Sequence, residues 1–356
     1  MDLSLFYFSD DAQIRDASRY RLLIDGARFA DTHGFSAVWT PERHFNRFGG
    51  LYPNPALTAA ALALVTERVA LRAGSVVAPL HQIQRLAEEW AVVDNLSAGR
   101  AGVSLAAGGN RNDFVLRPQA WQDRGSLVVE AIALLRRLWR GEAVTGSLAD
   151  GTAVECTTYP RPMAGEIPLW LTTGRRTETF RLAGEHGTGV LTHLVGQSEA
   201  ELTERTAVYR DALARSGTPF RGHVTLMLHT YVDSDADAVE EQVREPLQRY
   251  LASALDVGRV AAGRRATADP GADLYRIAVR PAYERYLGHD GLFGDVSEVV
   301  ARVERYRAAG VDEIACLIDF GVPHDTALRG LERLDEVRRA VAARAAAPSG
   351  VGAERG

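Results

Sequence analysis

The chain has 356 residues, with 41 Lys+Arg against 46 Asp+Glu and a formal net charge of −5, and every basic residue is arginine. The absence of lysine excludes Schiff-base aldolases, pyridoxal-phosphate enzymes, P-loop NTPases and protein kinases, which all need a lysine amine. A mildly acidic balance without basic blocks argues against a nucleic-acid partner. No apolar run approaches membrane-spanning length, and the first residues lack a signal-peptide pattern, so we expect no membrane partner and a cytoplasmic protein.

Short apolar runs alternate with segments of helical periodicity from residue 3 onward. Strands are expected at 3–8, 37–39, 69–77, 102–106, 169–172, 190–193, 224–232 and 313–320. Helices are expected at 18–33, 55–67, 85–96, 126–139, 177–186, 199–215, from 236 onward, at 296–309 and at 324–342. Eight apolar strands, each with a helical segment after it, predict an α/β fold, a (β/α)₈ TIM barrel, rather than an open doubly wound sheet.

Two stretches interrupt this alternation. Residues 141–162 contain glycines and β-formers and predict a β-hairpin insertion. Residues 255–294 show no sustained periodicity, and a loop of that length predicts a mobile lid before the last strand. We expect one domain over 1–345 and a disordered tail over 346–356.

In such barrels the active site lies at the carboxyl ends of the strands. After the second expected strand, Arg43 and His44 follow an acidic residue; His44 could act as a general base or could be a rim histidine in a solvated loop. After the third, Ala73, Gly74 and Ser75 let a flat ligand approach the backbone, or they only permit tight strand crossing. His81, at the same rim, is interpreted as a loop or capping residue.

The remaining candidates follow strands four to six. Residues 106–113 are glycine-rich but lack the spacing of a dinucleotide fingerprint. Thr173, Gly174, Arg175 and Thr177 lead into a helix, where free N–H groups and arginine favour phosphate; the alternative is a helix cap beside two solvated arginines. Thr192 and His193 would line the same half of the mouth. A phosphate-binding segment after strand five, small residues on strand three and a histidine after strand two together predict an elongated phosphorylated cofactor. No histidine spacing fits a metal site.

Several stretches resemble one family. They are 34–45, 76–100 with Ala87-Glu88-Glu89 and Leu96-Ser97-Ala98-Gly99-Arg100, 168–187 and 308–321. Together they make the chain similar to the bacterial-luciferase-like flavin monooxygenases, and in particular to the branch found with natural-product biosynthesis. The resemblance extends over nearly the whole chain.

The resemblance implies a barrel that binds reduced FMN, supplied by a separate flavin reductase. Oxygen would add to the flavin as a C4a-peroxyflavin and oxygenate a small or carrier-protein-bound secondary-metabolite intermediate. The family's non-proline cis peptide would fall at Gly74–Ser75, and the lid would exclude water. We also expect a homodimer.

The resemblance also assigns roles to residues. His44 would transfer the proton and Arg43 would stabilise the flavin electrostatically. Asn110 would contact the cofactor, and Tyr7, Phe8 and Asp113 would line the substrate pocket. Arg43 stands where luciferase has its catalytic histidine, and Ala106 and Ala107 replace its reactive cysteine and a phosphate-binding arginine. Light emission is therefore not expected, and Arg175 or Arg176 would hold the phosphate. The alternatives are an F420-dependent hydride-transfer enzyme and a non-catalytic flavin-binding partner subunit.

Overall fold

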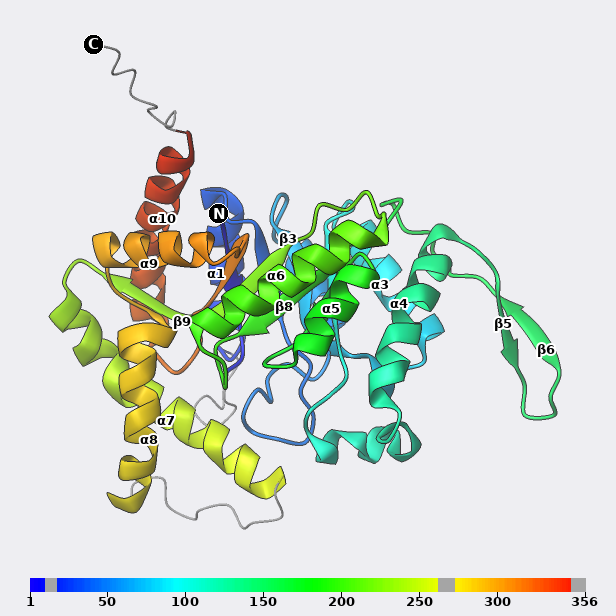
Figure 1. Ribbon diagram of the computed structural model, residues 1–356, viewed down its shortest axis with the longest axis horizontal. Helices are drawn as coiled ribbons and strands as arrows, with labels where there is room; N and C mark the ends of the chain where they lie inside the picture. Colours follow the sequence, from blue (N-terminus) through cyan, green and yellow to red (C-terminus); the bar gives the residue numbers. More distant parts are fainter. Residues whose placement is uncertain (10–17, 262–272, 347–356) are drawn as a thin grey trace.

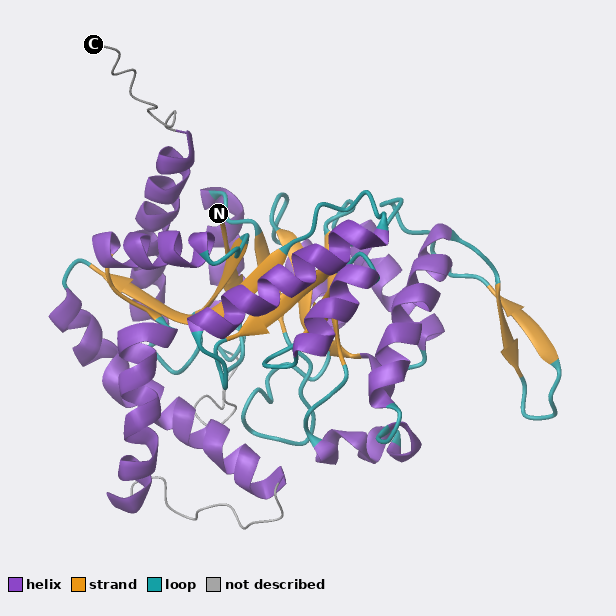
Figure 2. Ribbon diagram, viewed as in Figure 1, coloured by secondary structure: helices purple, strands orange, loops and turns teal. Residues whose placement is uncertain are grey.

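Parallel strands close into a barrel that helices surround, as the computed structural model shows (Figures 1 and 2). The structure describes residues 1–9, 18–261 and 273–346. The expected tail from residue 347 onward and the centre of the expected lid lie outside these ranges. The barrel strands, in chain order, are β1 (Asp2–Phe6), β2 (Ala37–Thr40), β3 (Ala70–Val77), β4 (Ala101–Ala106), β7 (Leu169–Thr172), β8 (Gly189–His193), β9 (Val224–Asp233) and β11 (Glu313–Leu317).

Closure follows from the order in which these strands pair. Around the barrel they run β9, β11, β1, β2, β3, β4, β7 and β8, and β8 pairs in parallel with β9. The surrounding helices are α1 (Arg21–His33), α2 (Pro55–Ala63), α3 (Ile83–Leu96), α4 (Arg124–Arg140), α5 (Thr177–Glu185), α6 (Glu199–Ser216), α7 (Ala236–Ala261), α8 (Asp273–Arg285), α9 (Val296–Ala308) and α10 (His324–Ala346). The predicted (β/α)₈ barrel is confirmed.

The hairpin insertion is also confirmed. Strands β5 (Val144–Ser147) and β6 (Ala153–Cys156) pair antiparallel and project away from the barrel (Figure 1). Between them a tight turn places Gly151 at a φ of 86°, a conformation that glycine adopts without steric cost.

The segment expected to be an aperiodic loop is largely regular where it is described, so that part of the prediction was wrong. It contains the end of α7, helix α8, a π-helix at Tyr286–Asp290 and strand β10 (Leu292–Asp295), which pairs with the end of β9. Pro281 lies inside α8, and proline is a signal for a helix end rather than a helix interior. Strand β10 is only four residues long, too short for its pattern to stand out.

The amino-terminal end of the barrel interior is filled by a buried ionic cluster. Glu313 accepts hydrogen bonds from Arg72 Nη1 at 2.8 Å and His223 Nε2 at 2.9 Å. The Arg72 guanidinium lies between two indole rings, 5.0 Å from the centroid of Trp39 and 4.6 Å from that of Trp170. We therefore look for the ligand site at the other end of the barrel, where the strands terminate.

Candidate active site

The loop after β2 holds two histidines on one buried carboxylate. Glu42, with a side chain only 1% exposed, accepts from His44 Nε2 at 2.7 Å and from His81 Nε2 at 2.8 Å on the same oxygen. Its other oxygen accepts from the Val77 amide at 2.7 Å. Burial opposes the charge of Glu42, but these hydrogen bonds win and lower its pKa. Burial would likewise lower the pKa of His81, yet Glu42 raises it above its ordinary value.

Arg43 extends from the same loop into the mouth of the barrel. Its Nε is buried and has no hydrogen-bond partner among the residues that the structure describes. Burial lowers the pKa of this guanidinium, while Asp113 and Tyr250 favour its charged form. Asp113, beyond β4, accepts from Asn110 Nδ2 at 2.6 Å, and burial raises its pKa despite the nearby Arg43. The structure thus brings His44, Arg43, Asn110 and Asp113 together.

Strand β3 contains an irregularity next to the expected cofactor site. The Gly74–Ser75 peptide bond is cis, as the resemblance implied, and the pairing of β3 with β4 shifts register between Gly74 and Val76. A Cβ on Gly74 would lie 2.6 Å from Phe6, so only glycine fits there. Ala73 is fully buried with its side chain in the core between barrel and helices, so it can offer a ligand only its backbone.

The expected phosphate segment lies where β7 meets α5. Thr173 is buried, Arg175, Arg176 and Thr177 are exposed, and α5 begins without a side-chain cap. Within the described ranges neither Arg175 nor Arg176 forms an ion pair, in contrast to Arg181 on α5, which pairs with Glu178 and Glu185. Free N–H groups and uncompensated guanidinium groups therefore coincide, as an anion site requires.

The end of the neighbouring strand β8 places Thr192 and His193 beside the expected phosphate segment. The His193 Nδ1 accepts from the Val195 amide at 3.1 Å, and burial lowers the pKa of this histidine, so the imidazole is neutral. A Cβ on Gly174 would lie 3.0 Å from His193 Cε1, which shows how closely the two loops approach. Thr192 is buried and accepts from Gln197 Nε2 at 2.9 Å.

The two aromatic residues expected in a substrate pocket lie differently. Tyr7 is fully buried against α1, and its hydroxyl donates to the Leu22 carbonyl at 3.4 Å, so the structure does not bring it into the mouth. Phe8 does lie there: its amide donates to Asp319 Oδ1 at 2.7 Å and its ring centroid is 5.1 Å from that of Phe48.

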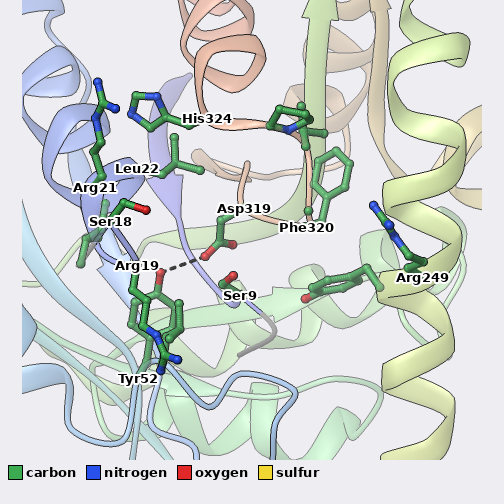
Figure 3. A pocket seen from close by; sticks show the side chains of 16 residues that line it. Ser9, Ser18, Arg19, Arg21, Leu22, Tyr52, Arg249, Asp319, Phe320 and His324 are labelled. Atoms are coloured by element: carbon green, nitrogen blue, oxygen red, sulfur yellow. Dashed lines mark hydrogen bonds between the residues drawn. The ribbon is translucent and has the colours of Figure 1, made fainter. Parts of the chain in front are cut away.

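Sequence reasoning gave no role to Glu42 and treated His81 as a capping residue. It also missed Asp319, just beyond β11, and Tyr52, whose hydroxyl donates to Asp319 Oδ2 at 2.9 Å (Figure 3). One available signal was Asp319 itself, an acid at the end of an otherwise apolar strand. Burial raises the pKa of Asp319 to about 7, despite hydrogen bonds from Phe8 and Tyr52 that lower it.

Two further properties concern the described ranges as a whole. In residues 1–9, 18–261 and 273–346, no three His, Cys, Asp or Glu side chains gather in a way that could hold a metal ion. Each helix in these ranges is too short or too polar to cross a membrane.

Comparison with known proteins supports this fold and gives the family. The family model described as luciferase-like monooxygenase matches residues 1–313. The chain is 27% identical over 349 residues to the oxygenase component of a flavin-dependent trigonelline monooxygenase from Acinetobacter baylyi, covering 94% of this chain and 93% of that protein. It is 26% identical over 296 residues to an F420-dependent glucose-6-phosphate dehydrogenase from Microbacterium testaceum, covering 75% and 87%.

One solved structure shares the fold over nearly its whole length. The monooxygenase RslO1 from Streptomyces bottropensis superposes with a TM-score of 0.79 at 22% identity, covering 94% of this chain and 98% of that one. The family match over most of the chain carries more weight than this likeness of fold. The chain belongs to the luciferase-like monooxygenase family of oxidoreductases.

Proposed function

We propose that the protein is an FMN-dependent monooxygenase that uses reduced FMN and O₂ to oxygenate a small organic molecule, free or carrier-bound, of secondary metabolism. The observation that carries the proposal is Arg43, with its buried and unpartnered Nε at the barrel mouth. A buried guanidinium N–H without a hydrogen-bond partner is costly unless a ligand supplies one. Reduced flavin is anionic at neutral pH, so it fits a site that supplies such a charge.

The other residues at the barrel mouth also fit reduced FMN. The peptide backbone at Gly74–Ser75 offers a surface without bulky side chains. Arg175, Arg176 and the free N–H groups of α5 suit a phosphate, and Thr173, Gly174 and Thr177 line that segment. Thr192 and His193 close it from β8, while Asn110 lies beside Arg43 and Asp113.

When bound, reduced FMN supplies the activation of O₂ and the transfer of one oxygen atom. His44 is the residue that moves a proton in this mouth, because Glu42 fixes its Nε2 and leaves its Nδ1 for a ligand. Arg43 stabilises negative charge that develops nearby, in a site where burial strengthens every electrostatic interaction. Asp113 balances the charge of Arg43.

A separate flavin reductase would supply the reduced cofactor. In support, the relative from Acinetobacter is named as the oxygenase component of its enzyme, which implies that the reducing component is a different chain. A non-catalytic flavin-binding subunit is a less favoured alternative, since the Glu42–His44–His81 cluster supplies proton-transfer groups that a silent subunit does not need.

F420-dependent hydride transfer is the second candidate, because one relative carries that name. F420 has a long acidic tail, and it would need basic groups well beyond the two arginines at α5. Anaerobic titration separates the candidates: we expect reduced FMN to bind with a dissociation constant at least tenfold below that of reduced F420. The reverse order would overturn the choice of FMN.

A further inference from the structure

A cavity of about 340 Å³ opens between the carboxyl ends of β11 and β1, the start of α1 and helix α7 (Figure 3). Its lining includes Tyr52, Arg249, Tyr250, Asp319 and Phe320. None of the residues suggested above for FMN lines it. The flavin residues follow β3, β4, β7 and β8, whereas this cavity lies on the β11, β1 and β2 side of the mouth.

We propose that this cavity binds the organic substrate, and that the substrate is a small aromatic carboxylate whose far end carries a hydrogen-bond donor. That the bound molecule is oxygenated rests on the proposed monooxygenase function. That it binds in this cavity does not. A volume near the lower limit for small-molecule pockets suits one or two rings.

The polar group of the cavity is Asp319. It is 5% exposed, and its two oxygens accept from the Phe8 amide and the Tyr52 hydroxyl. The Ser9 amide also acts on this carboxylate, which leaves one of its about four lone-pair positions for a ligand. The two hydrogen bonds hold Asp319 in place, which makes this group a preformed recognition point rather than a mobile surface acid.

The walls are aromatic, and their rings pack against other rings. The Tyr250 ring lies 4.8 Å from Phe48 and 4.9 Å from His229, centroid to centroid, and His229 lies 6.0 Å from Phe320. Tyr250 and Phe320 are therefore each in contact with a further ring. Flat apolar surfaces of this kind favour an aromatic body in the ligand.

The rim is cationic. Arg21 and Arg249 line the cavity from opposite sides, with exposed fractions of 63% and 48% (Figure 3). Each has an acidic neighbour one helical turn away on its own helix, Asp25 and Glu245, and these exposed pairs are weak. A guanidinium in such a pair can still bind a substrate carboxylate with its remaining donors.

Arg43 connects this cavity to the flavin side. Its backbone amide donates to the Tyr52 carbonyl at 2.9 Å, and Tyr250 is one of the groups that favour its charge. A ligand between Tyr52 and Tyr250 would therefore lie next to the loop that carries Arg43 and His44. That placement is what oxygen transfer between a flavin and a substrate requires.

The test uses calorimetry on the flavin-free protein at pH 7.5 with three probes: 4-hydroxybenzoate, 4-hydroxybenzamide and benzoate. We expect 4-hydroxybenzoate to bind at least tenfold tighter than the amide, which lacks the charge, and several-fold tighter than benzoate, which lacks the donor. Arg249→Gln should remove the preference for the carboxylate, and Asp319→Asn should weaken the preference for the hydroxyl. Arg244→Gln, an exposed arginine on the same helix, is the matched control and should change neither.

Equal affinities for the three probes, or an unchanged preference in Arg249→Gln, would overturn the proposal. Displacement of 4-hydroxybenzoate by FMN would also overturn it, because the cavity would then belong to the cofactor site. FMN affinity is measured in the same variants and should stay within twofold of the wild-type value. Failure of wild-type protein to bind FMN would count against the monooxygenase function alone, whereas failure to bind the probes would count against this cavity alone.

Discussion

His44 and Glu42 share a hydrogen bond of 2.7 Å in the loop after β2, and the carboxylate oxygen that accepts it also accepts from His81. One buried charge therefore orients two imidazoles at once. A carboxylate that holds the far nitrogen of a histidine fixes which nitrogen is left for a ligand. Glu42 is in this account the positioning residue, and His44 is the residue that moves the proton.

Replacing Glu42 by glutamine tests this arrangement. The hydrogen bond to Glu42 raises the pKa of His81, so Glu42→Gln should lower that pKa toward or below its ordinary value. Histidine-ring NMR titration measures the change. Glu89→Gln is the control: Glu89 favours the His81 charge only at longer range, so a smaller shift is expected. Equal shifts in the two variants would show that Glu42 is not the dominant partner.

The proposed phosphate site is tested on helix α5. Arg175→Gln should weaken FMN binding about tenfold, since a hydrogen bond to a charged group is worth roughly 1.5 kcal/mol. Arg181→Gln removes an arginine from the same helix whose partners are Glu178 and Glu185, and it should leave FMN affinity unchanged. Fluorescence quenching of FMN gives both constants. Loss of affinity in Arg181→Gln alone would mean that the phosphate binds elsewhere.

Asp319 predicts a pH dependence of stability. Its folded pKa of about 7 lies above the ordinary value of an aspartate, so the folded state retains a proton that the unfolded state releases. The stabilisation is complete below the unfolded pKa near 4 and is lost as pH rises to 7, a change on the order of 4 kcal/mol. Urea unfolding from pH 4 to 8 should show this decline in wild type. In Asp319→Asn it should flatten, and an equally steep decline there would assign it to other groups.

The ionic cluster at the closed end of the barrel gives a prediction about stability. Arg72 and His223 hold the pKa of the fully buried Glu313 well below its ordinary value. Glu313→Gln leaves Arg72 buried without its counter-charge and should lower the free energy of unfolding by about 3–5 kcal/mol. Glu178→Gln breaks only an exposed pair and should cost less than about 1 kcal/mol. Similar costs in urea unfolding would contradict a structural role for the cluster.

The barrel could be predicted from the sequence because buried parallel strands leave strong apolar runs between amphipathic helices. The segment from the end of α7 through α8 could not, because Pro281 stands inside α8, where local rules predict a break. Nor could the roles of Asp319 and Tyr52, which are 267 positions apart and meet only after the barrel closes. Strand ends indicate which residues reach the mouth, but side-chain pairing depends on the closed fold.

Rapid mixing tests the central claim most directly. Protein loaded anaerobically with reduced FMN is mixed with air-saturated buffer, and flavin reoxidation is followed by absorbance in wild type and in His44→Ala. We predict that bound FMN reoxidises with kinetics distinct from those of free FMN and that His44→Ala alters them while FMN affinity is retained. Traces identical with and without protein, together with tight binding of reduced F420, would contradict the account.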